Sequence, residues 1–346
     1  MKMLLIDSLY INEGGALQLL RYLIRELEKR SVQFFLLGDK RCAEALAHVS
    51  QKEILKASLH NRKQFYKKNI HRFNAVLCLG NIPPQMRLDI PAYTYFHNIN
   101  LLTLDQAKSI KNKILSWLKR EVFRHYKNNT DYWLVQTTNT ASVLKKKLHE
   151  TDSRTKILPF YYIPGTLRTL SASREERKDY VFVGFDFNGA KGHYELLEAW
   201  KILHKQGIRQ RLHLTVDKNN KIFTDKLDRL VQQGIDIVNH GPLPFEQVIQ
   251  LYGKSKATVY PSHNESLGLG IIEAIEAGCD VIGADLPYTY SVCQPSEIFE
   301  PYDPKSIAEA VSRYENGKSP RSELQISNQI DQLIKLITSI PQQRDA

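Results

Sequence analysis

The sequence has 346 residues, of which 42% are apolar and 25% charged, and its formal net charge is +11. This length exceeds the roughly 250–300 residues at which one hydrophobic core stops growing, so we expect two globular domains rather than a disordered or fibrous chain. The opening residues, MKMLLIDSLY, lack the long apolar run of a signal peptide, and no segment has the roughly 20 consecutive apolar residues of a membrane-spanning helix.

The positive charge belongs to the first half of the chain. Residues 1–165 contain 27 Lys and Arg and 13 Asp and Glu, whereas residues 166–346 contain 21 and 24. Two segments, 56–72 and 108–128, carry much of this charge. In the second, Ile110, Ile114, Trp117, Leu118 and Phe123 recur at near-helical spacing among Lys and Arg. Such a helix either binds an anionic membrane surface or acidic partner, or packs in the core with a cationic outer face; the asymmetry between the halves favours surface binding.

The first half alternates short apolar runs with longer helical segments. The pattern predicts strands over 2–7, 32–37, 74–80, 91–97 and 131–137, and a helix over 15–30. This alternation is typical of a parallel sheet wrapped by helices. Residues 163–179 are polar and charged and contain Pro164 and Gly165, which indicates a linker after a first domain over 1–162.

The second half repeats the alternation. Strands are predicted over 180–184, 211–216, 235–239, 257–261 and 280–284, with helices over 193–207, 223–234, 245–255, 269–278 and 304–317. We therefore expect a second domain over 180–322, and a C-terminal helix over 323–346 that packs back on the first domain. Ligands of open α/β sheets lie outside the carboxyl ends of the strands, so two facing domains would enclose one ligand in a cleft. The four cysteines, 42, 78, 279 and 293, show no metal-ligand or redox spacing and predict buried, reduced thiols in a cytoplasmic protein.

The segment ESLGLGIIEAIEAG, residues 265–278, follows a predicted strand and leads into a helix. The first turn of a helix has unpaired N–H groups and positive partial charge, and Gly268 and Gly270 would let a diphosphate approach the backbone. Glu273 would tilt back toward this helix start, where a carboxylate suits two ribose hydroxyls. Glu265 would bind a sugar hydroxyl on the other side of the phosphates. Two glutamates at this spacing also occur by chance, so the pair alone identifies no site.

The longer string YPSHNESLGLGIIEAIEAGCDVIGAD, residues 260–285, closely resembles glycosyltransferase family 4, within the group 1 glycosyl transferases. The resemblance is strong over 180–290 and looser over 1–160. It implies the GT-B fold, with two facing doubly wound Rossmann-like domains. It also implies transfer of a sugar from a nucleotide sugar with retention of configuration, and without a bound metal or cofactor.

The same resemblance implies a set of site residues. Those expected to bind the donor are Gly14, Gly15, Lys191, Glu265, Ser266, Leu267, Gly268, Leu269 and Glu273. The resemblance implies catalytic roles for Glu265, His97 and Lys191. Lys191 lies in VFVGFDFNGAKGHYELLEAW and would hold the diphosphate, and His97 ends the predicted strand YTYFH and would lie beside the donor sugar. A Gly-Gly pair otherwise indicates only a turn, and a single histidine is more often structural.

The sequence departs from the family at two points. Phe185 stands where members usually have an arginine, and VDKNNK, residues 216–221, replaces a glycine-rich turn. Lys218 is a candidate for the missing positive charge. The chain has no Asp-x-Asp, which argues against the metal-bridged donor site of the other major glycosyltransferase architecture.

The implied function is a metal-independent hexosyltransferase in bacterial surface-polysaccharide synthesis (O-antigen or capsule), at the inner face of the plasma membrane. A UDP-sugar would be the donor and a saccharide, lipid-linked, the acceptor, with the basic first domain attracted to anionic lipid. Two alternatives stay open: a nucleotide-sugar epimerase or hydrolase on this fold, and a non-catalytic nucleotide-sugar-binding protein, which the absent arginine favours. Nucleic acid is not expected as a partner, and no G-x-G-x-x-G follows a strand as in dehydrogenases.

Overall fold

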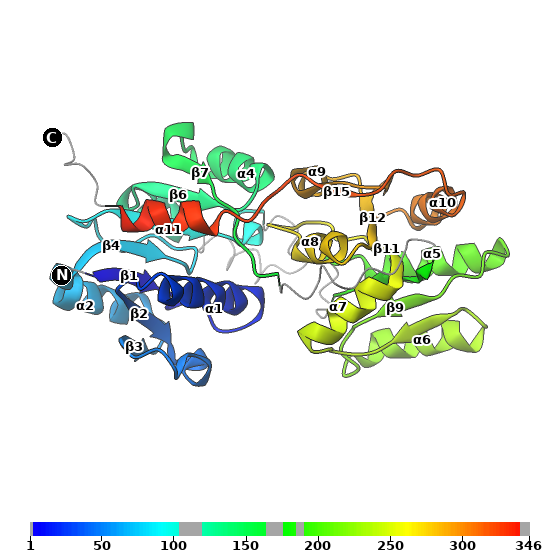
Figure 1. The fold of residues 1–346 in the computed structure, drawn as a ribbon, viewed down its shortest axis with the longest axis horizontal. Coiled ribbons are helices and arrows are strands. Elements are labelled where there is room, and N and C mark those ends of the chain that lie inside the picture. Colours follow the sequence, from blue (N-terminus) through cyan, green and yellow to red (C-terminus); the bar gives the residue numbers. More distant parts are fainter. Residues whose placement is uncertain (1–2, 104–119, 164–175, 185–189, 340–346) are drawn as a thin grey trace. The chain divides into compact units, whose positions relative to one another are not determined.

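The computed structural model of the protein describes residues 3–103, 120–163, 176–184 and 190–339. The chain divides into two compact units, one formed by Met1–Tyr162 with Ser327–Ala346 and the other by Ile163–Ile326. Each unit is built on its own parallel β-sheet (Figure 1). Much of the basic segment 108–128 and of the expected linker 163–179 lies outside the described residues, and so does Phe185.

The first unit contains a seven-stranded sheet in which all neighbouring strands are parallel. In order across the sheet, the strands are β3 (Lys52–Leu55), β2 (Phe34–Asp39), β1 (Met3–Asp7), β4 (Phe73–Cys78), β5 (Ala92–Phe96), β6 (Tyr132–Val135) and β7 (Thr155–Ile157). The α-helices whose bounds are both described in this unit are α1 (Gly14–Lys29), α2 (Leu59–Asn69), α4 (Thr138–Leu148) and α11 (Ile330–Thr338), and residues 120–126 are also helical. Short 3₁₀ helices lie at Lys40–Cys42, Glu44–Leu46, Ile70–Arg72, Ile99–Leu101, Lys127–Asn129 and Asp152–Arg154.

Helices cover both faces of this sheet, which explains why its strands are continuous apolar runs. Leu4 and Ile6 of β1 point to the face where α1 and α11 pack, whereas Leu5 between them points to the face covered by α2. The apolar side of α11 belongs to the first of these two cores. The segment 323–346, which the sequence predicts to be one helix, begins instead with strand β15 (Glu323–Leu324) of the second unit, and its helix starts at Ile330.

A buried ion pair lies at the carboxyl end of β1. Arg62 of α2 donates from Nε to Oδ2 of Asp7 over 2.6 Å, and each side chain is only 1% exposed. The same guanidinium donates to the carbonyls of Pro83 and Ile82 over 2.8 and 2.9 Å. A buried charge is tolerated when it is paired and fully hydrogen-bonded, so this arginine can fix the loop after β4.

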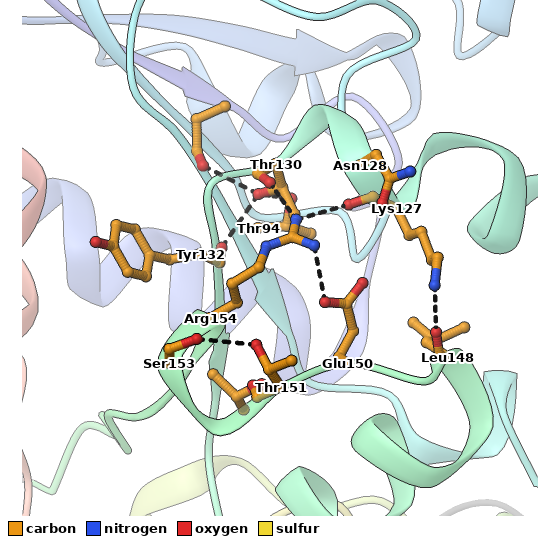
Figure 2. A network of polar contacts seen from close by, with 12 residues as sticks. Thr94, Lys127, Asn128, Thr130, Tyr132, Leu148, Glu150, Thr151, Ser153 and Arg154 are labelled. Atoms are coloured by element: carbon orange, nitrogen blue, oxygen red, sulfur yellow. Dashed lines mark hydrogen bonds and ion pairs between the residues drawn. The ribbon is translucent and has the colours of Figure 1, made fainter. Parts of the chain in front are cut away.

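A second polar network joins the end of α4 to the chain before β6 (Figure 2). Arg154 donates to Glu150 over 2.9 Å and to the carbonyls of Thr130 and Lys127 over 2.6 and 3.2 Å. Lys127 in turn donates to the carbonyl of Leu148 over 2.7 Å, which satisfies one of the carbonyls that the helix end leaves open. These bonds fix the crossover between β6 and β7.

The second unit contains a six-stranded parallel sheet with the order β10 (Ile237–Asn239), β9 (Leu212–Leu214), β8 (Lys178–Phe182), β11 (Ser255–Tyr260), β12 (Asp280–Ala284) and β14 (Glu297–Phe299). Strand β13 (Cys293–Gln294) pairs with β15 in a small antiparallel sheet. The helices are α5 (His193–Lys205), α6 (Lys221–Gln232), α7 (Phe245–Lys254), α8 (Leu269–Glu276), α9 (Pro287–Val292) and α10 (Pro304–Glu315). Val181 of β8 packs on α7 and α8, while α5 and α10 pack beside each other.

The four cysteines are buried and free, as the sequence predicts. Among the described residues, no helix is both long and apolar enough to cross a membrane. Strand β11 lies at the centre of the second sheet, between β8 and β12. The glutamate-containing loop therefore leaves the sheet at its middle, where neighbouring loops can contact it.

Candidate functional site

The loop between β11 and α8, residues 261–268, lies at the carboxyl end of the sheet in the second unit. Glu265 from this loop and Lys191 from the turn before α5 form an ion pair, with 2.6 Å between Nζ and Oε1. Tyr260 also donates to Oε1 of Glu265 over 3.2 Å. The two charged side chains are 29% and 14% exposed, so solvent and a ligand can still reach them. Two residues that are 74 positions apart in the sequence thus share one site.

Close backbone packing holds Lys191 beside this loop. Gly192, which precedes α5, has a φ of +67°, and a Cβ atom there would lie 2.3 Å from the carbonyl oxygen of Pro261. The backbone N–H of His263 donates to the carbonyl of Ala190 over 2.8 Å. Only glycine fits both the left-handed backbone and this contact. The turn before α5 is therefore fixed against the glutamate-containing loop.

The start of α5 is also tied to the end of β8. His193 is 2% exposed, and its Nε2 lies 3.2 Å from the carbonyl oxygen of Gly184. Burial lowers the pKa of His193 to about 4, so the imidazole is neutral and Nε2 donates this bond. The backbone N–H of Gly184 donates to the hydroxyl of Thr215 over 3.1 Å. These contacts fix Gly184, which follows β8, against the start of α5.

Helix α8 starts beside Glu265. Gly268 precedes the helix with a φ of +67°, and no side chain caps the helix start. The first N–H groups of α8 are therefore not used by a side-chain cap, and such groups can bind an anion. Gly270 also has a packing role, because a Cβ atom there would lie 3.1 Å from Tyr252 Oη and from a ring carbon of Tyr260. Its missing side chain makes room for two buried tyrosines.

Glu273 lies in the same helix and is 8% exposed. No other described residue forms a hydrogen bond or an ion pair with its carboxyl group. Burial raises its pKa from the ordinary value of 4.5 to about 8. An acid that is buried without a partner destabilises the folded protein, so its presence here calls for a ligand that donates hydrogen bonds to it.

The other candidate residues have separate positions. Ser266, Leu267 and Leu269 belong to the same loop and helix start as Glu265, and Leu267 is buried. Lys218 is exposed, and its side chain lies along Gly241 at the carboxyl edge of β9 and β10. The structure thus brings Lys191 and Glu265 together and leaves Lys218 without a contact to either.

The remaining three candidates belong to the first unit. Gly14 and Gly15 start α1; Gly14 has a φ of +64°, and a Cβ atom on either would meet nothing within 4 Å. Glu13 precedes the helix without capping it by its side chain, so N–H groups are open there too. His97 follows β5, and its Nε2 lies 2.9 Å from the carbonyl oxygen of Leu79.

Sequence reasoning missed the residues that support this site. Tyr260 holds Glu265, Gly192 allows the contact with Pro261, and His193 anchors the turn. Only Gly192 left a signal in the sequence, since a glycine between a lysine and a helix start often marks a left-handed backbone. Among the described residues, no cluster of three or more His, Cys, Asp or Glu is arranged to hold a metal ion.

Comparison with known proteins identifies the relatives of this chain. Residues 166–343 match the family described as glycosyl transferases group 1. Three serotype-specific mannosyltransferases WbdA from Escherichia coli are each 27% identical to the chain over 173 residues. These matches cover 48% of this chain and 20–21% of the relatives, so the chain spans about a fifth of their length.

Solved structures resemble the whole fold. Sucrose-phosphate synthase from Thermosynechococcus elongatus is 16% identical with a TM-score of 0.69, covering 91% of this chain and 90% of that one. HepE from Anabaena, in complex with UDP and glucose, is 13% identical with a TM-score of 0.62, covering 98% and 96%. WaaG, a glycosyltransferase involved in lipopolysaccharide biosynthesis, is 16% identical with a TM-score of 0.64, covering 97% and 100%. These similarities and the two parallel sheets confirm the predicted GT-B fold class.

Proposed function

Because this chain belongs to the group 1 glycosyl transferases, we propose that it transfers a sugar from a nucleotide-sugar donor to a saccharide acceptor. The observation that carries the proposal is Glu273, a buried carboxyl group without a partner, in the helix that starts beside the Lys191–Glu265 pair. A nucleotide would supply ribose hydroxyls to Glu273, which has no partner among the described residues, and a diphosphate to Lys191, which can bind it while keeping Glu265.

In the proposed donor complex, the diphosphate binds the ammonium of Lys191 and the open N–H groups at the start of α8. These fixed donors would stabilise the charge that grows on the leaving diphosphate, and one such donor typically contributes about 3–4 kcal/mol. Lys191 can contact the diphosphate and keep Glu265, since an ammonium has three N–H donors. We propose that no divalent metal is needed for this step.

Two residues are proposed to contact the donor sugar. Glu265 accepts hydrogen bonds from its hydroxyls, and His97 contacts the sugar where the acceptor attacks. We propose retention of configuration by attack on the face from which the diphosphate leaves, as in glycosyltransferase family 4, with a donor phosphate oxygen taking the acceptor's proton. Gly14 and Gly15 offer further N–H groups to the phosphates, and Lys218 is a candidate for an additional contact.

A UDP-sugar is the proposed donor. HepE, with a similar fold, was solved with UDP and glucose. The mannosyltransferase relatives make a mannosyl donor the main competitor. A thermal-shift panel of UDP, GDP, ADP and dTDP, each with and without Mg²⁺, tests both donor class and metal dependence. A ligand at 100 times its Kd stabilises the protein by about 2.7 kcal/mol, which raises Tm by about 5–10 °C. The donor assignment would be refuted if Tm did not rise with any of the four nucleotides and also did not rise with UDP-glucose or GDP-mannose.

The proposed acceptor is a lipid-linked saccharide in surface-polysaccharide synthesis, at the cytoplasmic face of a bacterial plasma membrane. Helix α2 supports an electrostatic contact with anionic lipid. Its Phe65 and Tyr66 are buried in the core, which leaves the exposed Lys63, Lys67 and Lys68 for a surface. Each lysine near such a surface contributes about 1 kcal/mol.

Vesicle sedimentation tests this contact. We expect binding to phosphatidylglycerol vesicles at low salt, loss of binding at high salt, and a large loss when the three α2 lysines are changed to Glu. The matched control changes three exposed lysines of the second unit, Lys205, Lys221 and Lys254, to Glu. Equal losses in both triple variants would show a general charge effect and remove the role of α2.

Two other functions would use the same donor site. A nucleotide-sugar epimerase or hydrolase would convert the donor without an acceptor, and a non-catalytic protein would bind the donor without converting it. Product analysis with the donor alone separates the first from a transferase. Donor binding without turnover across a set of saccharide acceptors would favour the second.

A further inference from the structure

The loop after β4, residues 79–83, is anchored on both sides of Asn81 by one ion pair. The backbone N–H of Leu79 donates to the carbonyl of Asp7 over 2.8 Å. Beyond Asn81, the guanidinium of Arg62 binds the carbonyls of Ile82 and Pro83. Because Asp7 and Arg62 are themselves paired and almost fully buried, Asn81 has a fixed position.

Asn81 has a backbone conformation that is uncommon outside glycine, because its φ of +69° is in the left-handed region. Its side chain is 8% exposed and faces His97. The amide oxygen accepts the backbone N–H groups of His97 and Asn98 over 2.8 and 3.1 Å. Two donors on Oδ1 fix the orientation of the amide, so Nδ2 must be the atom that lies 3.3 Å from Nε2 of His97.

The ring nitrogen Nε2 of His97 has two neighbours that demand opposite protonation states. The carbonyl oxygen of Leu79, at 2.9 Å, requires a proton on Nε2, whereas Nδ2 of Asn81, at 3.3 Å, would require a lone pair. The shorter contact has the normal length of an N–H···O hydrogen bond and decides the choice. Burial lowers the pKa of His97, which keeps the ring neutral. The proton is therefore on Nε2 and the lone pair on Nδ1.

We propose that Asn81 is a positioning residue. Its Oδ1 fixes the backbone of His97, so that the carbonyl of Leu79 holds the ring as the Nε2–H tautomer and Nδ1 accepts a hydrogen bond from a hydroxyl of the bound sugar. No hydrogen bond to another described residue involves Nδ1, and the ring's other backbone contact, besides that with Leu79, is with His97 itself. A neutral nitrogen with a lone pair selects a hydroxyl over a phosphate or carbonyl oxygen. The contact with a sugar rests on the proposed function, whereas the tautomer is a property of the protein alone.

The tautomer can be read directly by long-range ¹H–¹⁵N correlation spectra of histidine-labelled protein without ligand, with His97 assigned by its loss in His97→Gln. We expect the Nε2–H pattern for His97 in the wild-type protein. An Nδ1–H pattern would overturn the proposal, whether or not the protein transfers sugar. On addition of UDP-glucose, the ¹⁵N resonance of Nδ1 should move as it accepts a hydrogen bond. No movement with saturating UDP-glucose would overturn the hydroxyl contact.

Two variants separate positioning from a merely structural role. Asn81→Asp puts a carboxylate oxygen beside Nε2, which should raise the pKa of His97 above that in the wild type. Activity should then be lost at a pH where the wild type is still active and return as the pH rises above this new pKa, because the imidazole must be neutral to accept. Asn81→Gly keeps the left-handed backbone without the amide and should lower kcat/KM about tenfold or more at every pH, with a mixed tautomer.

Matched controls are Asn128→Asp, an exposed asparagine of the same unit, and His149→Gly, another left-handed position with a φ of +53°. Both should leave the spectrum of His97 and the pH profile unchanged. An Asn81→Asp profile parallel to that of the wild type would overturn the positioning role. A folded Asn81→Gly variant with the wild-type tautomer and wild-type kcat/KM would do the same. If Asn81→Gly does not fold, the wild-type spectrum and Asn81→Asp still decide.

Discussion

Glu273 provides the sharpest prediction, because its effect on stability and its effect on binding have opposite signs. In the folded protein its pKa is about 8, against 4.5 for the ordinary group. A carboxyl group with a raised pKa binds more protons in the folded than in the unfolded state. Its stabilisation is therefore fully present below pH 4.5 and is lost as the pH rises toward 8.

The shift corresponds to about 5 kcal/mol between the protonated and the ionised group, as an order of magnitude. At pH 5.5 the raised pKa lowers the free energy of unfolding by about 1 kcal/mol relative to low pH, and at pH 8.5 it lowers it by most of the 5 kcal/mol. Glu273→Gln keeps the shape and removes the charge. We therefore expect the variant to gain stability over the wild type by roughly 3 kcal/mol more at pH 8.5 than at pH 5.5.

Urea unfolding at the two pH values measures this difference. Trp200 is the one tryptophan in the second unit, so its fluorescence in a Trp117→Phe, Trp133→Phe background reports on the unit that contains Glu273. Glu276→Gln is the control, because Glu276 lies in the same helix with a partly exposed side chain. A Glu273→Gln variant with the same pH dependence as the wild type would refute the claim of a buried, unpartnered carboxyl group.

The binding of a nucleotide should change the protonation of Glu273, and it should be weakened by the substitution that stabilises the protein. Ribose hydroxyls donate to the ionised carboxylate and lower its pKa, so binding should release a proton between pH 5.5 and 8. Isothermal titration with UDP in buffers of different ionisation enthalpy measures this proton. Glu273→Gln should bind UDP at least tenfold more weakly although the protein is more stable, and unaltered affinity would contradict the ribose contact.

Two further predictions concern the turn before α5. Gly192→Ala should destabilise the protein by about 3 kcal/mol or more, since the new Cβ atom would lie 2.3 Å from the carbonyl of Pro261. Gly207→Ala, which has the same left-handed backbone but open space around it, should cost only about 1 kcal/mol in the same urea titration; equal costs would deny the close contact. Lys191→Ala should lower turnover roughly 100- to 1,000-fold. Lys205→Ala, further along α5, should change turnover less than twofold, and equal effects of the two would remove Lys191 from the site.

The order of strands and helices could largely be predicted, because buried parallel strands are short apolar runs. The predicted segments 74–80, 91–97 and 257–261 each overlap an observed strand, with ends displaced by one or two residues. Strand β3 was missed because Lys52–Leu55 includes two charged residues at the edge of the sheet. Edge strands need no apolar side chains on both faces, so their sequences lack the signal.

The candidate site could be predicted only where function leaves a local motif. Glu265, Gly268 and Glu273 lie close in the sequence, and their string predicts a loop followed by a helix. Contacts between residues far apart in the sequence could not be predicted in this way, because the Lys191–Glu265 pair depends on which strands are neighbours in the sheet. Asn81 carries no motif at all, and its contacts with His97 form only because the ends of β4 and β5 are side by side.

The most direct test is a crystal structure of the protein with UDP. We predict phosphate oxygens within hydrogen-bonding distance of Lys191 Nζ and of the backbone N–H groups of Leu269 and Gly270, and ribose hydroxyls on the carboxylate of Glu273. UDP bound with its phosphates remote from these groups would contradict the account.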